Sequence, residues 1–132
     1  MPLTKYIVRA VNLDSTLRHD HSALSMSHID GENGTGTCSI QIVDAVGDNI
    51  AMRHLVELWC SDTAYGDSDG ITAFAVGTGL ELHEFIQNKY IKVLSDATGL
   101  IVMNCTIAGG GTTYIMAADH SMVYVEQVDI TS

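Results

Sequence analysis

The sequence predicts an all-β fold, an immunoglobulin-like β-sandwich with an extended N-terminal arm, and a jelly roll is the alternative. Short apolar runs follow one another closely, and apolar residues at helical spacing are scarce. The chain also has twelve glycines and a single proline. Short strands at such intervals, separated by glycine or aspartate turns, are typical of sandwiches and barrels.

The first strands are expected at residues 38–42, where apolar and polar residues alternate, and at residues 50–60. The second run places Val56 and Leu58 on one face, and Leu55 and Trp59 on the other. Further strands are expected at residues 71–76, 90–94, 100–107, 112–118 and 122–128. Residues 80–89 have helix-like apolar spacing and are expected to form one helical turn or an irregular connection.

Two similar turns follow apolar strands, one from Asp44 to Gly47 and one from Asp96 to Gly99. An aspartate that opens a turn can accept hydrogen bonds from the backbone ahead of it, and glycine tolerates positive φ. Both turns are therefore predicted to be tight hairpins that join antiparallel strands.

Residues 1–36 are predicted to be an N-terminal arm and residues 37–132 the sandwich body. Residues 6–11 could form a strand, residues 12–21 are polar with isolated leucines, and residues 30–36 have the composition of a flexible linker. Such an arm packs either on its own body or on a neighbouring subunit, and the sequence leaves both possibilities open.

Composition excludes several classes of function. The formal net charge of −10 disfavours binding to nucleic acid. No apolar run approaches the ~20 residues of a membrane helix, so no membrane partner is expected. The beginning of the chain does not resemble a signal peptide, which predicts that the protein stays where it is synthesised. Cys38, Cys60 and Cys105 lie in apolar runs and are expected to be reduced, buried thiols.

Polar clusters offer weak candidates for chemistry. His19 and His21 could share a metal with a third ligand, and Asp62, Asp67 and Asp69 could hold calcium in a loop. An exposed polar arm and an ordinary surface loop are the simpler interpretations, so no metal, cofactor or catalytic residue is predicted. His54 is expected to be a core or interface histidine with a hydrogen-bond partner.

A second apolar face at Leu55 and Trp59 predicts that a cover, either the arm or a partner subunit, lies there. Residues of the arm and one exposed loop aromatic complete the expected partner-binding set: Leu13, Leu17, His19, His21, Leu55, Trp59 and Tyr65.

The order of motifs at residues 42–66, 77–79, 93–99 and 111–117 resembles a β-sandwich module of tailed-bacteriophage virion proteins, including small head decoration (cement) proteins. The likeness covers about residues 36–128. It implies a non-enzymatic virion protein, assembled in the cytoplasm of the host bacterium, that binds the outside of the capsid. Its partners would be the major capsid protein, whose subunit contacts it stabilises, and itself, as a homodimer or homotrimer.

Two alternatives stay open. One is a receptor- or glycan-binding module of a tail fibre or adhesin, with recognition in exposed loops such as residues 61–70. The other is a metal-dependent enzyme of jelly-roll type, which requires several histidines to converge.

Overall fold

The computed structural model describes residues 23–68, 73–119 and 122–131, and within them it contains strands and no helix. The described residues therefore include no helix long and apolar enough to cross a membrane. Nine strands follow in order: β1 (Ala23–Glu32), β2 (Thr35–Val43), β3 (Leu55–Ser61), β4 (Ala73–Thr78), β5 (Leu80–Ile86), β6 (Tyr90–Leu94), β7 (Leu100–Thr106), β8 (Gly111–Asp119) and β9 (Met122–Ile130).

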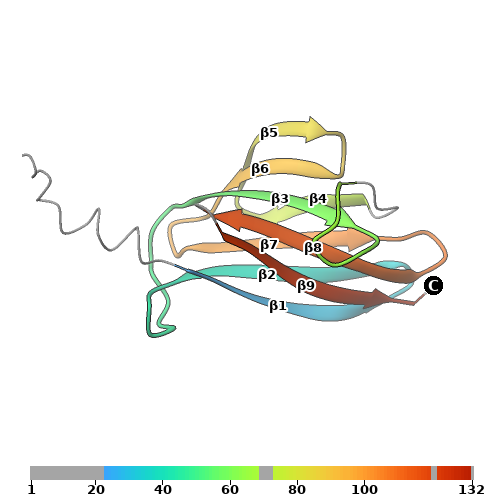
Figure 1. The fold of residues 1–132 in the computed structure, drawn as a ribbon, viewed down its shortest axis with the longest axis horizontal. Helices are drawn as coiled ribbons and strands as arrows, with labels where there is room; N and C mark the ends of the chain where they lie inside the picture. The colour runs from blue at the N-terminus through green and yellow to red at the C-terminus, as the bar shows by residue number, and fades with distance from the viewer. Residues whose placement is uncertain (1–22, 69–72, 120–121, 132) are drawn as a thin grey trace, which may run out of the picture.

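The strands form two layers that are joined along one seam (Figure 1). One layer has the order β4-β7-β2-β1 and the other the order β9-β8-β3-β6-β5. The layers meet where β1 and β9 run parallel, with Gly31 opposite Ile130. The predicted β-sandwich is confirmed.

The core lies between the layers and is built from alternate residues of the facing strands. Ile40 of β2, Ile101 of β7, Leu58 of β3 and Ile115 of β8 are fully buried. Because the side chains of a strand alternate between faces, burial of Val56, Leu58 and Cys60 directs Leu55, Glu57 and Trp59 of β3 outward.

Seven predicted strands are present as β2, β3, β4, β6, β7, β8 and β9. The predicted strand at residues 50–60 is shorter than expected, because β3 begins only at Leu55. Within β3 the predicted alternation between two faces is confirmed. Before Leu55 the chain crosses from one layer to the other, and the Ile50 N–H donates to the Ile42 carbonyl.

The expected boundary at residue 36 is wrong, because residues 23–36 belong to the sheet. β1 pairs with β2 along most of its length, from Ala23–Val43 to Glu32–Thr35. Residues 30–36 form a hairpin instead of a linker, with Asn33 and Gly34 both at positive φ. Asn-Gly is the strongest short-range hairpin signal, since both residues tolerate the left-handed backbone of a type I′ turn. Residues 1–22 of the predicted arm lie outside the described residues.

The helical turn expected at residues 80–89 is also wrong, because residues 80–86 form the edge strand β5. Its register with β6 shifts twice, between Glu81 and His83 and between Glu84 and Ile86. The extra residues at these bulges are Leu82 and Phe85. At each bulge the alternation of side chains between the two faces of the strand shifts by one residue. These shifts give the apolar residues of this segment the spacing that looks helical in the sequence.

The two aspartate-glycine turns form as predicted but connect different strands than expected. Asp96 Oδ1 accepts the Thr98 and Leu100 N–H groups, and Asp44 Oδ1 accepts those of Val46 and Asp48. However, β6 and β7 lie in different layers, and so do β2 and β3. The turns therefore begin crossings between layers and do not join paired strands.

The strand order differs from that of a nine-stranded immunoglobulin domain because two strands, the fourth and the sixth, have exchanged places. In that arrangement, the fourth and fifth strands extend the layer of the third, eighth and ninth, and the sixth joins the opposite layer. Here β6 lies beside β3, and β4 lies in the opposite layer beside β7. As a result, β5 and β6 extend the second layer beyond β3.

Candidate docking face

The outer surface of the layer β9-β8-β3-β6-β5 carries three rows of side chains across β3, β6 and β5, and we call this surface the docking face. Strand register defines the rows, because directly paired residues point to the same side. The leucine row is Leu55, Leu94 and Leu80; the charged row is Glu57, Lys92 and His83; the aromatic row is Trp59, Tyr90 and Ile86, joined by Phe85.

Aromatic rings lie in contact along the third row. The centroids of Trp59 and Tyr90 are 5.6 Å apart, and those of Tyr90 and Phe85 are 4.6 Å apart. His83 continues the series, with its ring nearly perpendicular to that of Phe85 and the two centroids 4.7 Å apart. Tilted contacts at these separations are favourable for aromatic pairs. The bulge in β5 supplies Phe85, so the irregular edge strand completes the row.

The charged row is held by side chains of the aromatic row. The Tyr90 hydroxyl donates a hydrogen bond of 2.8 Å to Glu57 Oε1, and this bond raises the pKa of Tyr90. Lys92 Nζ lies 5.9 Å from the centre of the Phe85 ring. Both charged groups thus have a contact with an aromatic side chain of the neighbouring row.

On β8 and β9, Ala118 and Val123 continue the row of Glu57, and Val125 lies in the row of Trp59, where Met116 of β8 is fully buried. Exposed apolar side chains gather at its β5 side: Leu55, Leu80, Phe85 and Ile86 are each 43–55% exposed. The outer face of a water-exposed sheet is usually polar. Exposed apolar side chains on both sides of a charged row are therefore unusual for an outer face, and exposed apolar patches mark interaction sites.

An open pocket of about 390 Å³ lies at the end of the aromatic row. It is lined by Trp59, Tyr65, Gly66, Asp67, Ser68 and Tyr90. The indole N–H of Trp59 donates to the Gly66 carbonyl, which fixes the ring against the following loop. Tyr65 adopts φ of 58° and is 66% exposed.

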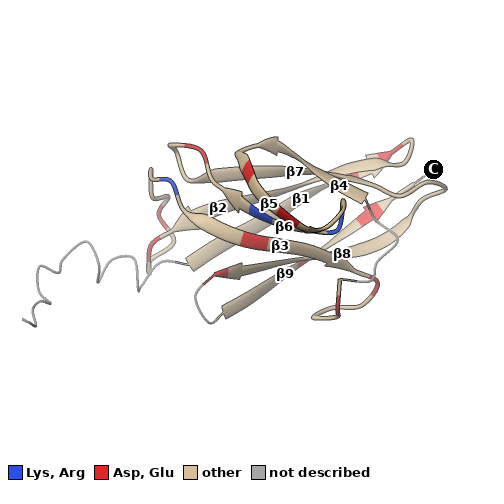
Figure 2. Ribbon diagram, turned by 90° about the horizontal axis from the view of Figure 1, so that it is seen from above, with Lys and Arg blue, Asp and Glu red and all other residues tan. Residues whose placement is uncertain are grey.

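Positive charge is concentrated on the side of the docking face (Figure 2). The lysines and arginine of the described residues are Arg53, Lys89 and Lys92, which lie before β3, before β6 and in β6. Aspartates and glutamates occur on both layers and in the turns. The docking face is consequently less acidic than a net charge of −10 alone implies.

The structure brings together three of the predicted partner-binding residues. Leu55 and Trp59 lie on the same outer face of β3, and Tyr65 lines the pocket with Trp59. Leu13, Leu17, His19 and His21 lie outside the described residues, so their predicted roles stay predictions.

Phe85, Tyr90 and Lys92 of the docking face were missed by sequence reasoning. Tyr90, Lys92 and Leu94 alternate with the buried Ile91 and Val93, so apolar residues on both faces of residues 90–94 were the available signal. Phe85 had no such signal, because its position depends on a bulge.

In the part of the chain that the structure describes, His54 and the three cysteines have structural positions. His54 is buried, with Nε2 at 2.6 Å from Asp119 Oδ1, as expected of a satisfied core histidine. Cys38, Cys60 and Cys105 are fully buried thiols outside any disulfide, and burial raises the pKa of Cys105 to about 12. Thiols with raised pKa values are poor nucleophiles at neutral pH.

Within the described ranges, no three His, Cys, Asp or Glu side chains are arranged to hold a metal ion. Asp69, the third aspartate of the possible calcium loop, lies outside those ranges.

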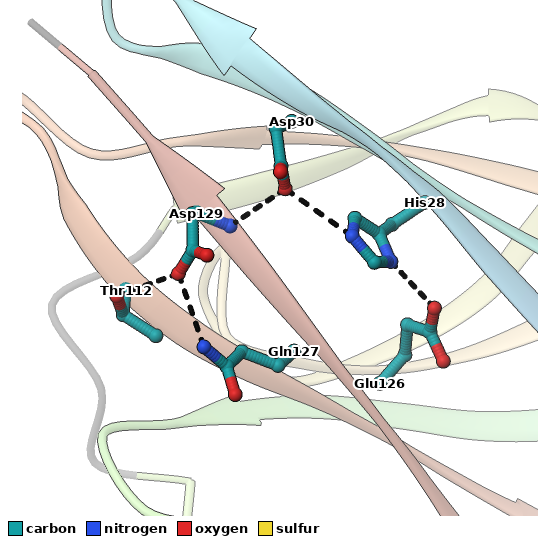
Figure 3. A network of polar contacts seen from close by, with 6 residues as sticks. All are labelled: His28, Asp30, Thr112, Glu126, Gln127 and Asp129. Atoms are coloured by element: carbon teal, nitrogen blue, oxygen red, sulfur yellow. Dashed lines mark hydrogen bonds and ion pairs between the residues drawn. The ribbon is translucent and has the colours of Figure 1, made fainter.

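A separate polar network links β1 to β9 beside the seam (Figure 3). His28 Nδ1 is 2.5 Å from Glu126 Oε2, and Nε2 is 3.2 Å from Asp30 Oδ1. Asp30 accepts the Asp129 N–H, and Asp129 accepts bonds from Thr112 and Gln127. The Glu126 bond raises the pKa of His28 above 6.5. This network holds two strands together.

Comparisons with known proteins give fold likeness alone. No protein-family model and no curated protein sequence matches the chain. A ZirS C-terminal domain aligns with a TM-score of 0.41 and 11% identity over 86% of this chain and 67% of that one. A cohesin module from a Clostridium perfringens family 33 glycoside hydrolase aligns with a TM-score of 0.45 and 9% identity, over 84% of this chain and 96% of that one. At these scores neither comparison bears on function.

Proposed function

We propose that this protein is a non-enzymatic structural protein of a bacteriophage virion that binds the outside of the capsid and stabilises contacts between major capsid subunits. The docking face carries the proposal, because an apolar sheet surface of this kind acts by fitting another protein surface. The buried cysteines and the His54–Asp119 pair have structural roles, which agrees with a protein that works by association. The sequence resemblance supplies the capsid as partner.

Binding would combine two contacts. The docking face associates copies of the protein, and other surfaces, including the predicted arm, reach capsid subunits. Several linked contacts raise the effective concentration of each, so every single contact can be weak.

The experiment mixes purified full-length protein with expanded, undecorated phage heads and measures co-sedimentation. Saturable binding at micromolar concentration is expected. The variant Leu55→Asp should bind less, because it places a carboxylate on the docking face. Ile29→Asp is a matched control, since Ile29 is a 71% exposed apolar side chain in the other layer. Wild-type protein that stays in the supernatant at all concentrations would refute the proposal.

A glycan-binding module is the second candidate, and the pocket favours it. Trp59, Tyr65 and Tyr90 offer ring faces for stacking, and Asp67 and Ser68 offer polar partners for hydroxyl groups. Tyr65→Ala distinguishes the candidates, because it should abolish binding to a glycan array but only weaken binding to heads, for which Leu55 and Trp59 remain in place.

A further inference from the structure

We propose that a second copy of this chain covers the docking face, related to the first by a two-fold axis that runs along the strands between β3 and β6. This inference rests on the proposed function, in which the face is a protein-docking surface. It specifies the partner and the way in which the two faces meet.

The charged row is self-complementary about this axis. Glu57 and Lys92 are register partners on β3 and β6. An axis between these strands places Glu57 of each copy opposite Lys92 of the other. The ion pairs found among the described residues all involve histidine, so Lys92 has no carboxylate partner in that part of the chain. The two cross-pairs would provide one.

The apolar rows also match under the same rotation. Leu55 faces Leu94 of the second copy, and Trp59 faces Tyr90. Exposed side chains of β5 then lie over β8, where Ala118 is half-buried and Met116 is fully buried within its own copy. Two sheets that pack face to face in this way interdigitate at about 10 Å.

Edge-to-edge pairing is a poorer way to join two copies. The free edge of this layer on the β5 side carries two bulges. Bulges disrupt the regular row of backbone groups that an added strand requires, and proteins use them to block such pairing. The apolar side chains of β5 are therefore better covered from the face than from the edge.

The size and the charge of the docking face set the expected affinity of the dimer. Five strands span about 19 Å at ~4.8 Å per spacing, and the rows span about 14 Å along the strands. These dimensions give a patch of roughly 270 Å² per copy, well below the ~800 Å² per partner of a standard interface, so a weak dimer with a Kd of about 100 µM is expected. Glu57 and Lys92 balance one another, whereas the remaining surface carries the net charge of −10. Screening of that repulsion should make salt tighten the dimer.

Sedimentation of the full chain, together with the fluorescence of Trp59, tests the proposal. Trp59 is the sole tryptophan, so its emission reports on the docking face directly. Its emission should shift to shorter wavelength as dimers form. Glu57→Lys should weaken the dimer at least about tenfold, because it sets like charges against each other. Glu57→Lys/Lys92→Glu should restore the dimer, since the pairs are re-formed in reverse.

Glu32→Lys is the matched control. It changes the net charge by the same amount as Glu57→Lys, but Glu32 is exposed on β1, in the other layer. The dimer of this variant should be as tight as that of the wild type, or slightly tighter. Circular dichroism verifies that each variant is folded. A dimer that forms without change in Trp59 emission, or a double variant that stays monomeric, would overturn this geometry.

The two proposals fail in different ways. A protein that is monomeric at about 1 mM but still binds heads would overturn the dimer and leave the proposed function standing. A protein that dimerises as described but never binds heads would do the reverse.

Discussion

His54 is a polar side chain within a sandwich of apolar residues, and its contacts explain how the fold accommodates it. Its ring lies 2.6 Å from Asp119, and its backbone N–H donates to Ser95 Oγ. Ser95 in turn donates to the Met52 carbonyl. A buried polar group without a partner costs free energy, whereas these groups satisfy one another. The pair ties the segment before β3 to the end of β8.

Asp119→Ala should lower the free energy of unfolding by about 2 kcal/mol, because it leaves the buried imidazole without its carboxylate partner. Urea unfolding followed by fluorescence measures the change. Glu32→Ala, on the exposed surface of β1, should shift stability by no more than about 0.5 kcal/mol. Equal midpoints for Asp119→Ala and wild type would show that the pair is not structural.

At the scale of elements, the seam between β1 and β9 depends on more than one short stretch of backbone pairing. Gly31 pairs with Ile130, the Thr131 N–H donates to Gly31, and the Gly34 N–H donates to Thr131. The His28 network adds side-chain contacts between the same two strands. Because the pKa of His28 is raised, the charged imidazolium is the form that the two carboxylates stabilise.

This network should make stability depend on pH. A group whose pKa is higher in the folded state stabilises fully below its unfolded pKa, here about 6.5, and loses that effect as pH rises through the folded pKa. His28→Gln cannot take up a proton. The difference in stability between wild type and His28→Gln should therefore be larger at about pH 5.5 than at about pH 9. Denaturant titrations at both values measure it, and a difference independent of pH would contradict the assignment.

The two aspartate-glycine turns offer a matched pair of substitutions. Gly47 and Gly99 have φ of 94° and 80°, but a Cβ at Gly47 meets nothing, whereas one at Gly99 would lie 2.2 Å from the Ile50 carbonyl oxygen. Gly47→Ala should cost about 1 kcal/mol through backbone strain alone. Gly99→Ala adds a clash with the Ile50 backbone, so it should lower the free energy of unfolding clearly more than Gly47→Ala does. Thermal unfolding ranks them, and equal costs would show that the Gly99 turn relaxes freely.

Sequence reasoning succeeded where one residue pattern determines one structure, and failed where pairing partners decide. Alternation located β2 and the outward Leu55 and Trp59, and the turn chemistry of Asp44 and Asp96 was correct. It failed at β5, because a bulge is a property of two strands and leaves no trace in one. The Asn33–Gly34 dipeptide predicts a hairpin, whereas the polar composition of residues 30–36 predicts a linker, and the structure follows the dipeptide.

At the scale of the whole molecule, the strands of the two layers differ in how deeply they are buried and in how many strands they pair with. β2 and β7 lie next to each other inside their layer, and each contributes fully buried side chains to the core. β5 pairs with β6 alone, and each of its seven residues is exposed. Few buried contacts and solvent-accessible hydrogen bonds lower the free energy of local opening. The docking face therefore combines a rigid part on β3 with a less stable rim on β5.

Hydrogen exchange should reveal this gradient. At a protein concentration low enough to favour monomer, paired amides of β5 should exchange at least about a hundredfold faster than those of β2 and β7, which open only with the whole sandwich. When the concentration is raised into the dimeric range, protection of β5 should increase and that of β2 should not, because β5 lies under the second copy and β2 lies in the other layer. Mass spectrometry of peptic fragments resolves the two strands. Protection of β5 that already equals that of β7 at low concentration would mean that the rim is as stable as the core and gains nothing from a partner.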